Sequence, residues 1–154
     1  MTLRISSTAF SDGQKIPVAH SGDGADTSPP LAWSDAPAGT VSWALICEDP
    51  DAPRGTYTHW VLFNLPAETH QLPGGVSHDA TLADGARHGT NDFGKLGYGG
   101  PAPPAGKPHR YFFKLYALDT LLEKLPSGAS RSELLAAIEG HVLAEAHVMG
   151  TYQR

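Results

Sequence analysis

The chain has little cysteine, no long apolar run and no excess of positive charge. Cys47 is the only cysteine, so an intrachain disulfide is impossible, and its apolar neighbours favour a buried small side chain over a reactive thiol. No stretch approaches the ~20 apolar residues of a membrane span. The segment "MTLRISSTAFSDG" at the start lacks the apolar core of a signal peptide. We therefore expect a cytoplasmic protein without stable membrane insertion.

The formal net charge of -5 argues against broad electrostatic binding to nucleic acid or to an anionic membrane. It leaves room for a local anion pocket. Hydrophobic residues make up 40% of the chain and charged residues 18%, which is typical of a folded globular protein. A length of 154 residues predicts one domain, 1–154, with a sizeable core.

Short apolar segments alternate with turn-rich loops and predict an antiparallel β protein. The clearest strands are 41–48, 59–65 and 110–118, and the weaker candidates are 3–6, 31–33 and 86–90. The segment 110–118 is apolar at nearly every position, so we expect a central strand that is covered on both faces.

One helix is predicted near 130–145. Ser130 and Glu133 have the spacing of a capping box. An apolar stripe at helical spacing, formed by Leu134, Leu135, Ile138 and Val142, indicates core packing. A short closing strand is expected within 147–154.

The segment 91–111 has neither a helical nor a strand period. It holds five glycines and four prolines. Loops of this length in compact domains are usually functional or disordered. Because prolines stiffen it and Phe93 and Tyr98 can anchor it, we interpret it as an ordered wall.

Polar side chains stand where three of the predicted strands begin or end. If 41–48 and 59–65 form a hairpin, Asp49 and His59 share one rim of the sheet. Asp49 continues an apolar strand face, so its carboxylate needs a partner, and His59 is the expected one. His109 precedes the third strand and would place a second imidazole at that rim.

Two imidazoles and backbone N–H groups suit a small oxyanion such as phosphate or a carboxylate. Gly99 and Gly100 would let the backbone approach it closely. The alternative is that the histidines cap loops and the aspartates order turns. Asp51 is interpreted as structural, since an Asp between prolines often binds turn N–H groups. Glu48 alternates to the opposite face, as a solvated or rim group.

The other histidines lack a partner pattern. We expect surface or structural roles for His20, His70, His78, His88 and His147, and helix packing for His141.

These residues also carry a family pattern. The segments "DPDAP" (49–53), "HWVLFN" (59–64) and "YGGPAPPAGKPHRY" (98–111) resemble the phosphatidylethanolamine-binding protein family. "SPPLAW" (28–33), "NDFGKLGYGGP" (91–101) and the ending "GHVLAEAHVMGTYQR" are similar to its prokaryotic Raf-kinase-inhibitor-like branch, the YbhB/YbcL group. The resemblance covers nearly the whole chain in the right order.

The resemblance implies a β-sandwich of two antiparallel sheets with a small anion pocket at one end. It places Asp49, His59, His109 and Tyr111 in that pocket, with Pro103 and Pro104 shaping its wall. It further implies a cis Ala52–Pro53 bond, a structural role for Pro53, and a homodimer. No metal or cofactor is expected, although Asp49, His59 and His109 would also suit a facial metal set.

Three functions stay open. The first is a regulatory binding protein for a small anionic or phosphorylated molecule. The second is an inhibitor of a protease or kinase that acts through surface loops. The third is an acid–base enzyme, a hydrolase or isomerase, that uses the Asp/His pocket. The eukaryotic C-terminal helix has no evident counterpart, and Tyr152 cannot take the role of its tyrosine, so lipid binding and kinase inhibition transfer poorly. We expect binding rather than catalysis.

Overall fold

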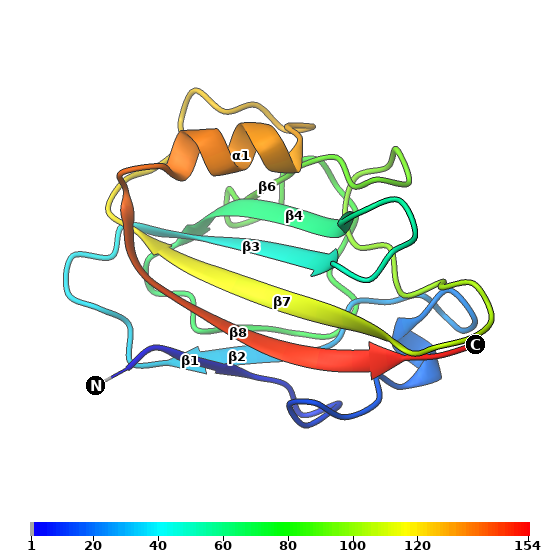
Figure 1. The fold of residues 1–154 in the computed structure, drawn as a ribbon. Helices are drawn as coiled ribbons and strands as arrows, with labels where there is room; N and C mark the ends of the chain where they lie inside the picture. Colours follow the sequence, from blue (N-terminus) through cyan, green and yellow to red (C-terminus); the bar gives the residue numbers. More distant parts are fainter. Residues whose placement is uncertain (1) are drawn as a thin grey trace.

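The most apolar segments of the chain form one large sheet, as Figure 1 shows for the computed structural model, which describes residues 2–154. The elements in chain order are β1 (Arg4–Ser6), the 3-10 helix η1 (Val18–His20), β2 (Leu31–Ser34), β3 (Ser42–Asp49), β4 (Tyr57–Pro66), β5 (Gln71–Leu72), β6 (Arg87–His88), β7 (His109–Leu118), α1 (Arg131–Ile138) and β8 (Val142–Tyr152). The five-stranded sheet has the order β6-β4-β3-β7-β8 and the small sheet the order β1-β2-β5. All strand pairs within these two sheets are antiparallel.

The main core lies between the two sheets. Inward side chains of the large sheet, such as Trp43 and Phe113, are fully buried. The small sheet covers them from below in Figure 1, and the Trp33 and Trp43 rings are 5.7 Å apart between centroids. Cys47 belongs to this core, as predicted. The predicted antiparallel sandwich with one principal helix is therefore confirmed.

The helix covers part of the outer face of the large sheet. Leu134 and Ile138 pack with β3, β4 and β7 side chains in a second core. The predicted capping box is present, with Ser130 and Glu133 bonded to each other's backbone N–H groups.

The helix ends at Ile138, earlier than predicted. Gly140 adopts a positive φ of 83°, which stops the helix, and the following residues pair with β7 instead. Val142 therefore begins β8, and the predicted closing strand is longer than expected. His141 lies after the helix and binds Asp119 at 2.8 Å, so the expectation of helix packing for it was wrong.

The central strand is β3, not the segment 110–118. All residues of β3 are buried, whereas β7 carries the exposed Arg110 and the half-buried Phe112 and Lys114. The prediction for 110–118 failed because the helix covers only the second half of β7. The pairing of 41–48 with 59–65 was correct, with Cys47 opposite Trp60. The three weaker strand candidates are also confirmed, as β1, β2 and β6.

The turn between β3 and β4 contains no cis bond, nor does any other part of residues 2–154. The predicted cis Ala52–Pro53 bond was therefore wrong. The chain reverses by other means: the Asp51 N–H donates to Asp49 Oδ1, the Gly55 N–H donates to Ala52 O, and Gly55 has a φ of 107°.

Candidate ligand-binding site

One end of the large sheet carries a small cavity, at the right-hand end of the sheet in Figure 1, where β3 ends and β4 and β7 begin. Its volume is about 220 Å³. Its lining comprises Asp49, Ala52, Pro53, Tyr57, His59, Phe93, Ala102, Pro103, Pro104, His109 and Tyr111. The structure thus brings most of the sequence-predicted site residues around one cavity. Antiparallel order places the end of β3 beside the starts of both neighbours, which is why residues 60 positions apart meet here.

Asp49 is paired with His109 rather than with His59. The His109 Nδ1 lies 2.6 Å from Asp49 Oδ2, and both side chains are buried. The expected pairing with His59 was wrong, because the His59 Nδ1 is bonded to Gly99 O instead. The register of the β3–β4 ladder also shifts beside these residues. Cys47 pairs with Trp60 but Glu48 pairs with Thr58, so His59 falls at the irregularity.

His59 is held by the loop that forms the wall. Its Nδ1 lies 2.7 Å from Gly99 O, and the Gly99 N–H donates back to His59 O at 2.9 Å. Burial lowers the pKa of His59 below its usual value, while the Gly99 carbonyl and the Asp49 charge act in the opposite direction. The ring of His59 is therefore neutral near pH 7 when no anion lies beside it.

Gly99 and Gly100 have a different role from the predicted one. Neither lines the cavity. Their N–H groups are already used, by His59 O and by Asp26 Oδ1. A side chain at Gly100 would meet His20 O at 2.4 Å, so this glycine lets the loop pack closely against the chain near His20. The two glycines position the wall and offer no donor to a ligand.

The predicted wall itself is present. Tyr98 is buried and its hydroxyl donates to His20 O at 2.6 Å, so it anchors the loop as expected. Phe93 is 40% exposed and lines the cavity instead of anchoring the loop. Pro103 and Pro104 contribute to the lining, as the resemblance implied.

Aromatic rings surround the imidazole of His59. The rings of Tyr57, Phe93 and Tyr111 lie 5.1, 5.4 and 5.1 Å from it between centroids. Tyr57 was missed in the sequence, although it stands two residues before His59 and so points to the same side of its strand. The pocket is thus lined mainly by aromatic and proline side chains, together with two imidazoles and one carboxylate.

Two carboxylates next to the pocket have structural partners. Asp51 accepts a hydrogen bond from the backbone N–H of Arg110 and forms a bidentate ion pair with the Arg110 guanidinium. It does not make the contacts within the turn that were expected. This ion pair lowers the pKa of Asp51 to about 2. Glu48 is buried and bonded to Arg131, with Lys114 at 3.6 Å. It is neither solvated nor at a rim, because α1 closes over that side of β3.

The remaining histidines have structural or surface positions. His20 and His78 bind backbone carbonyls, and the buried His88 contacts Trp60 and Asp79. His147 is exposed and stacks edge-on against Phe112. These positions agree with the sequence interpretation.

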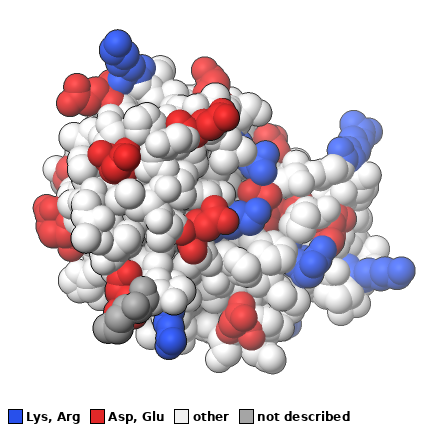
Figure 2. All heavy atoms as spheres, turned by 60° about the vertical axis from the view of Figure 1, so that its left-hand side comes forward, with Lys and Arg blue, Asp and Glu red and all other residues white. Residues whose placement is uncertain are grey.

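The face of the molecule that Figure 2 draws has mixed charge, with acidic and basic side chains both present and wide uncharged areas between them. Within residues 2–154, no helix is long and apolar enough to cross a membrane.

The fold and the cavity define a β-sandwich protein with a small cavity at one end. The sequence profile of the phosphatidylethanolamine-binding protein family matches residues 6–153, and the chain belongs to this family. It is 49% identical to a UPF0098 protein of Methanothermobacter thermautotrophicus over 152 residues, covering 99% of both chains. It is 41% identical to YbhB of Escherichia coli, covering 97% and 99%.

A solved structure agrees with this assignment. The crystal structure of YbcL of E. coli, described as a member of the mammalian PEBP family, superposes with a TM-score of 0.91 at 37% identity. The alignment covers 100% of this chain and 99% of YbcL. The structural match to YbcL thus extends over the whole fold.

Proposed function

We propose that the chain is a regulatory binding protein for one small oxyanion, free phosphate or the phosphoryl group of a small molecule. The ligand would lie in the cavity at the end of the sheet, between His59 and His109. Its remaining surface would contact the aromatic and proline lining. This proposal includes no catalytic step.

The observation that carries the proposal is that the Nε2 atoms of His59 and His109 are accessible and have no hydrogen-bond partner in the part of the chain that the structure describes. Each ring uses its Nδ1 within the protein, while no partner is found for either Nε2 in the described residues. Residues 2–154 also contain no fully buried side-chain nitrogen without a partner. Both Nε2 atoms are therefore open to the cavity that the two residues line. Two accessible ring nitrogens among mainly aromatic and proline side chains are typical of a site that orients a polar ligand.

The volume of the cavity also suits a small ligand. About 220 Å³ lies below the ~300–1,000 Å³ of pockets for drug-sized molecules. A phosphoryl group with a small substituent is compatible with this size. A whole lipid would have to leave its acyl chains outside.

Replacing either histidine tests the proposal. Charge-assisted hydrogen bonds contribute ~1.5–3 kcal/mol each, so His59→Ala or His109→Ala should weaken phosphate binding roughly 10- to 100-fold. Isothermal titration calorimetry with phosphate measures the affinity, and circular dichroism checks that both variants fold. His147→Ala, on the exposed outer face, is the matched control and should bind as the wild type does. Equal affinity in all four proteins would exclude the pocket as the phosphate site.

A further inference from the structure

The hydrogen bonds of the two pocket histidines determine where their protons lie. The His59 Nδ1 faces a carbonyl oxygen at 2.7 Å. A carbonyl oxygen can only accept, so Nδ1 carries the proton of the neutral ring. The Nε2 of neutral His59 is therefore an unprotonated lone pair that opens to the cavity. Neutral His59 offers an acceptor to a ligand, and not a donor.

Neutral His109 also carries its proton on Nδ1, but its partner there is a carboxylate and not a carbonyl group. Its Nδ1 lies 2.6 Å from Asp49 Oδ2, and Asp49 Oδ1 accepts the Asp51 N–H at 2.7 Å. A carboxylate held in this way accepts from Nδ1–H, which leaves the Nε2 of neutral His109 as a second lone pair. A fully ionised oxyanion also has only acceptors. It would meet repulsion at both ring nitrogens until a proton is added.

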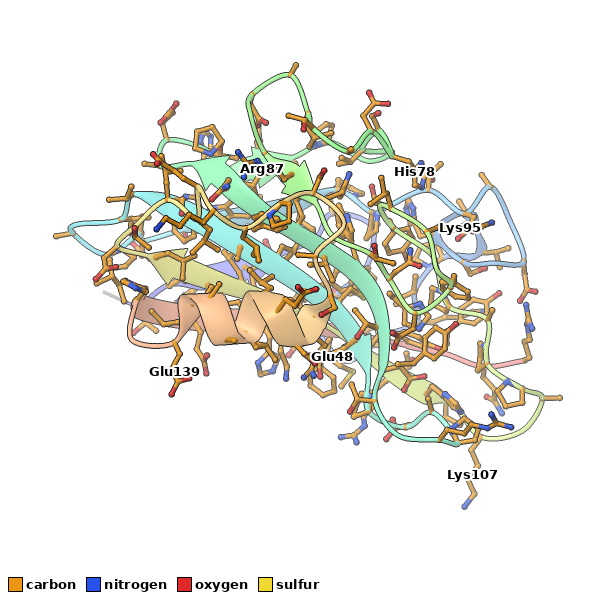
Figure 3. All side chains as sticks on the ribbon, turned by 90° about the horizontal axis from the view of Figure 1, so that it is seen from above. Glu48, His78, Arg87, Lys95, Lys107 and Glu139 are labelled. Atoms are coloured by element: carbon orange, nitrogen blue, oxygen red, sulfur yellow. The ribbon has the colours of Figure 1, made fainter. Side chains whose placement is uncertain are left out.

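No fixed cation within residues 2–154 lines this cavity to balance an anion. Two arginines whose charges act on pocket residues have other partners: Arg110 pairs with Asp51 and Arg154 with Asp23. Lys107 is exposed, and Figure 3 shows it pointing away from the body of the protein at the tip of its loop. The charge of a bound anion must therefore be balanced by protons within the pocket.

The surroundings of His59 decide how easily it takes that proton. Burial lowers its pKa, and the charges of Asp49, Asp92 and Asp26 raise it. Tyr57 and Tyr111 contact its ring, and burial raises the pKa of both hydroxyls, so they stay protonated and uncharged.

The surroundings of His109 are the Asp49 carboxylate on its Nδ1, the Asp51 charge and the neighbouring Arg110. An anion placed between the two rings adds a negative charge near both Nε2 atoms. That charge favours protonation of a ring.

From this arrangement we infer that the pocket takes up an oxyanion only together with a proton, carried either by the ligand or by a ring Nε2. It would thereby favour acids that keep a proton near neutral pH, such as phosphate and phosphomonoesters, over the anions of strong acids, such as sulfate. This inference rests on the proposed function. It adds the chemical class of the ligand and the response of the site to pH.

Sulfate is the cleanest probe, because it does not titrate near neutral pH and any dependence on pH belongs to the protein. Uptake of one proton makes sulfate affinity fall about tenfold for each pH unit above the pKa of the ring that takes it. We expect this slope in wild-type calorimetry up to about pH 8.5, well above the ordinary histidine pKa. The same titrations in two buffers of different ionisation enthalpy should show uptake of about one proton. Phosphate is titrated in parallel.

The variant Asp49→Asn distinguishes two roles for Asp49. Its charge either favours a proton on a pocket imidazole or only repels the bound anion. The variant keeps both imidazoles but removes the Asp49 charge, which raises the pKa of His59. The curve of sulfate affinity against pH should therefore shift to lower pH. His147→Gln, with its imidazole outside the pocket, should leave the curve unchanged. If Asp49 only repelled the anion, Asp49→Asn would strengthen binding equally at every pH, which would overturn the inference.

The phosphate titration distinguishes the two levels of the proposal. Phosphate binding together with a sulfate affinity that does not change with pH would overturn the proton coupling and leave the phosphate site in place. Absence of phosphate binding at every pH would overturn the proposed function itself, and with it this inference.

Discussion

At the scale of single residues, the pocket depends on two histidines whose Nδ1 atoms are already hydrogen-bonded within the protein. His59 and His109 each use Nδ1 within the protein and leave Nε2 open to the cavity. A ring oriented in this way loses little freedom when a ligand arrives, because its rotamer is already held. Asp49 stays buried because it accepts from both His109 and the Asp51 N–H. The carboxylate that was expected to pair with His59 is thus a positioning group for the His109 imidazole.

The burial of His88 leads to a separate prediction about how the free energy of unfolding changes with pH. It is fully buried, accepts the Trp60 indole N–H at Nε2, and contacts Asp79 O through Nδ1. Burial lowers its pKa, as it does for His59. The unfolded chain then binds more protons than the folded one, so the stability is complete above pH ~6.5 and is lost as pH falls through that value. Each such group changes the free energy of unfolding by at most ~1.4 kcal/mol per pH unit.

Urea unfolding at a series of pH values measures this effect. His88→Gln should be less stable than the wild type at neutral pH, since it loses the contact with Asp79, but its stability should fall less steeply on acidification. His70→Gln changes an exposed imidazole and serves as control, with a wild-type slope. A His88→Gln profile parallel to that of the wild type would show that His88 does not titrate on unfolding.

At the scale of elements, the capping box decides where α1 begins. The Ser130 hydroxyl accepts the Glu133 N–H at 3.1 Å, and Glu133 accepts the Ser130 N–H at 2.9 Å. Ser130→Ala leaves a helical N–H without its acceptor and should lower the free energy of unfolding by about 1 kcal/mol. Ser132→Ala, on the exposed face of the same helix, should be neutral or slightly stabilising, because alanine has the higher helix propensity. Chemical unfolding of both variants provides the comparison, and equal stabilities would contradict the capping role.

A comparison of the strands shows which secondary-structure elements could be predicted from the sequence. Sequence patterns located seven of the eight strands, β8 only in its last part, since such patterns depend only on nearby residues. The two-residue β5 was missed because two residues carry no period. The helix was extended too far because Val142 continued its apolar stripe. Pairing with β7 then placed that residue in a strand.

At the scale of the whole molecule, assembly is still a prediction. The resemblance to prokaryotic relatives implies a homodimer, and we expect one here. Multi-angle light scattering at micromolar concentration should give twice the 16.3 kDa mass of the chain. A mass of one chain that persists as the concentration is raised would contradict the dimer.

The sequence by itself determined the class of fold, the positions of the main strands and the chemical types gathered at one rim. Local patterns suffice for these, because side-chain alternation and turn residues act over a few positions. The tertiary structure alone decided that Asp49 binds His109, that Gly99 and Gly100 support the wall instead of facing the ligand, and that β3 is the central strand. Each of these depends on a hydrogen bond to a distant loop, a close backbone approach or the placement of a distant helix. Such features arise from packing between segments far apart in the chain, which no local pattern records.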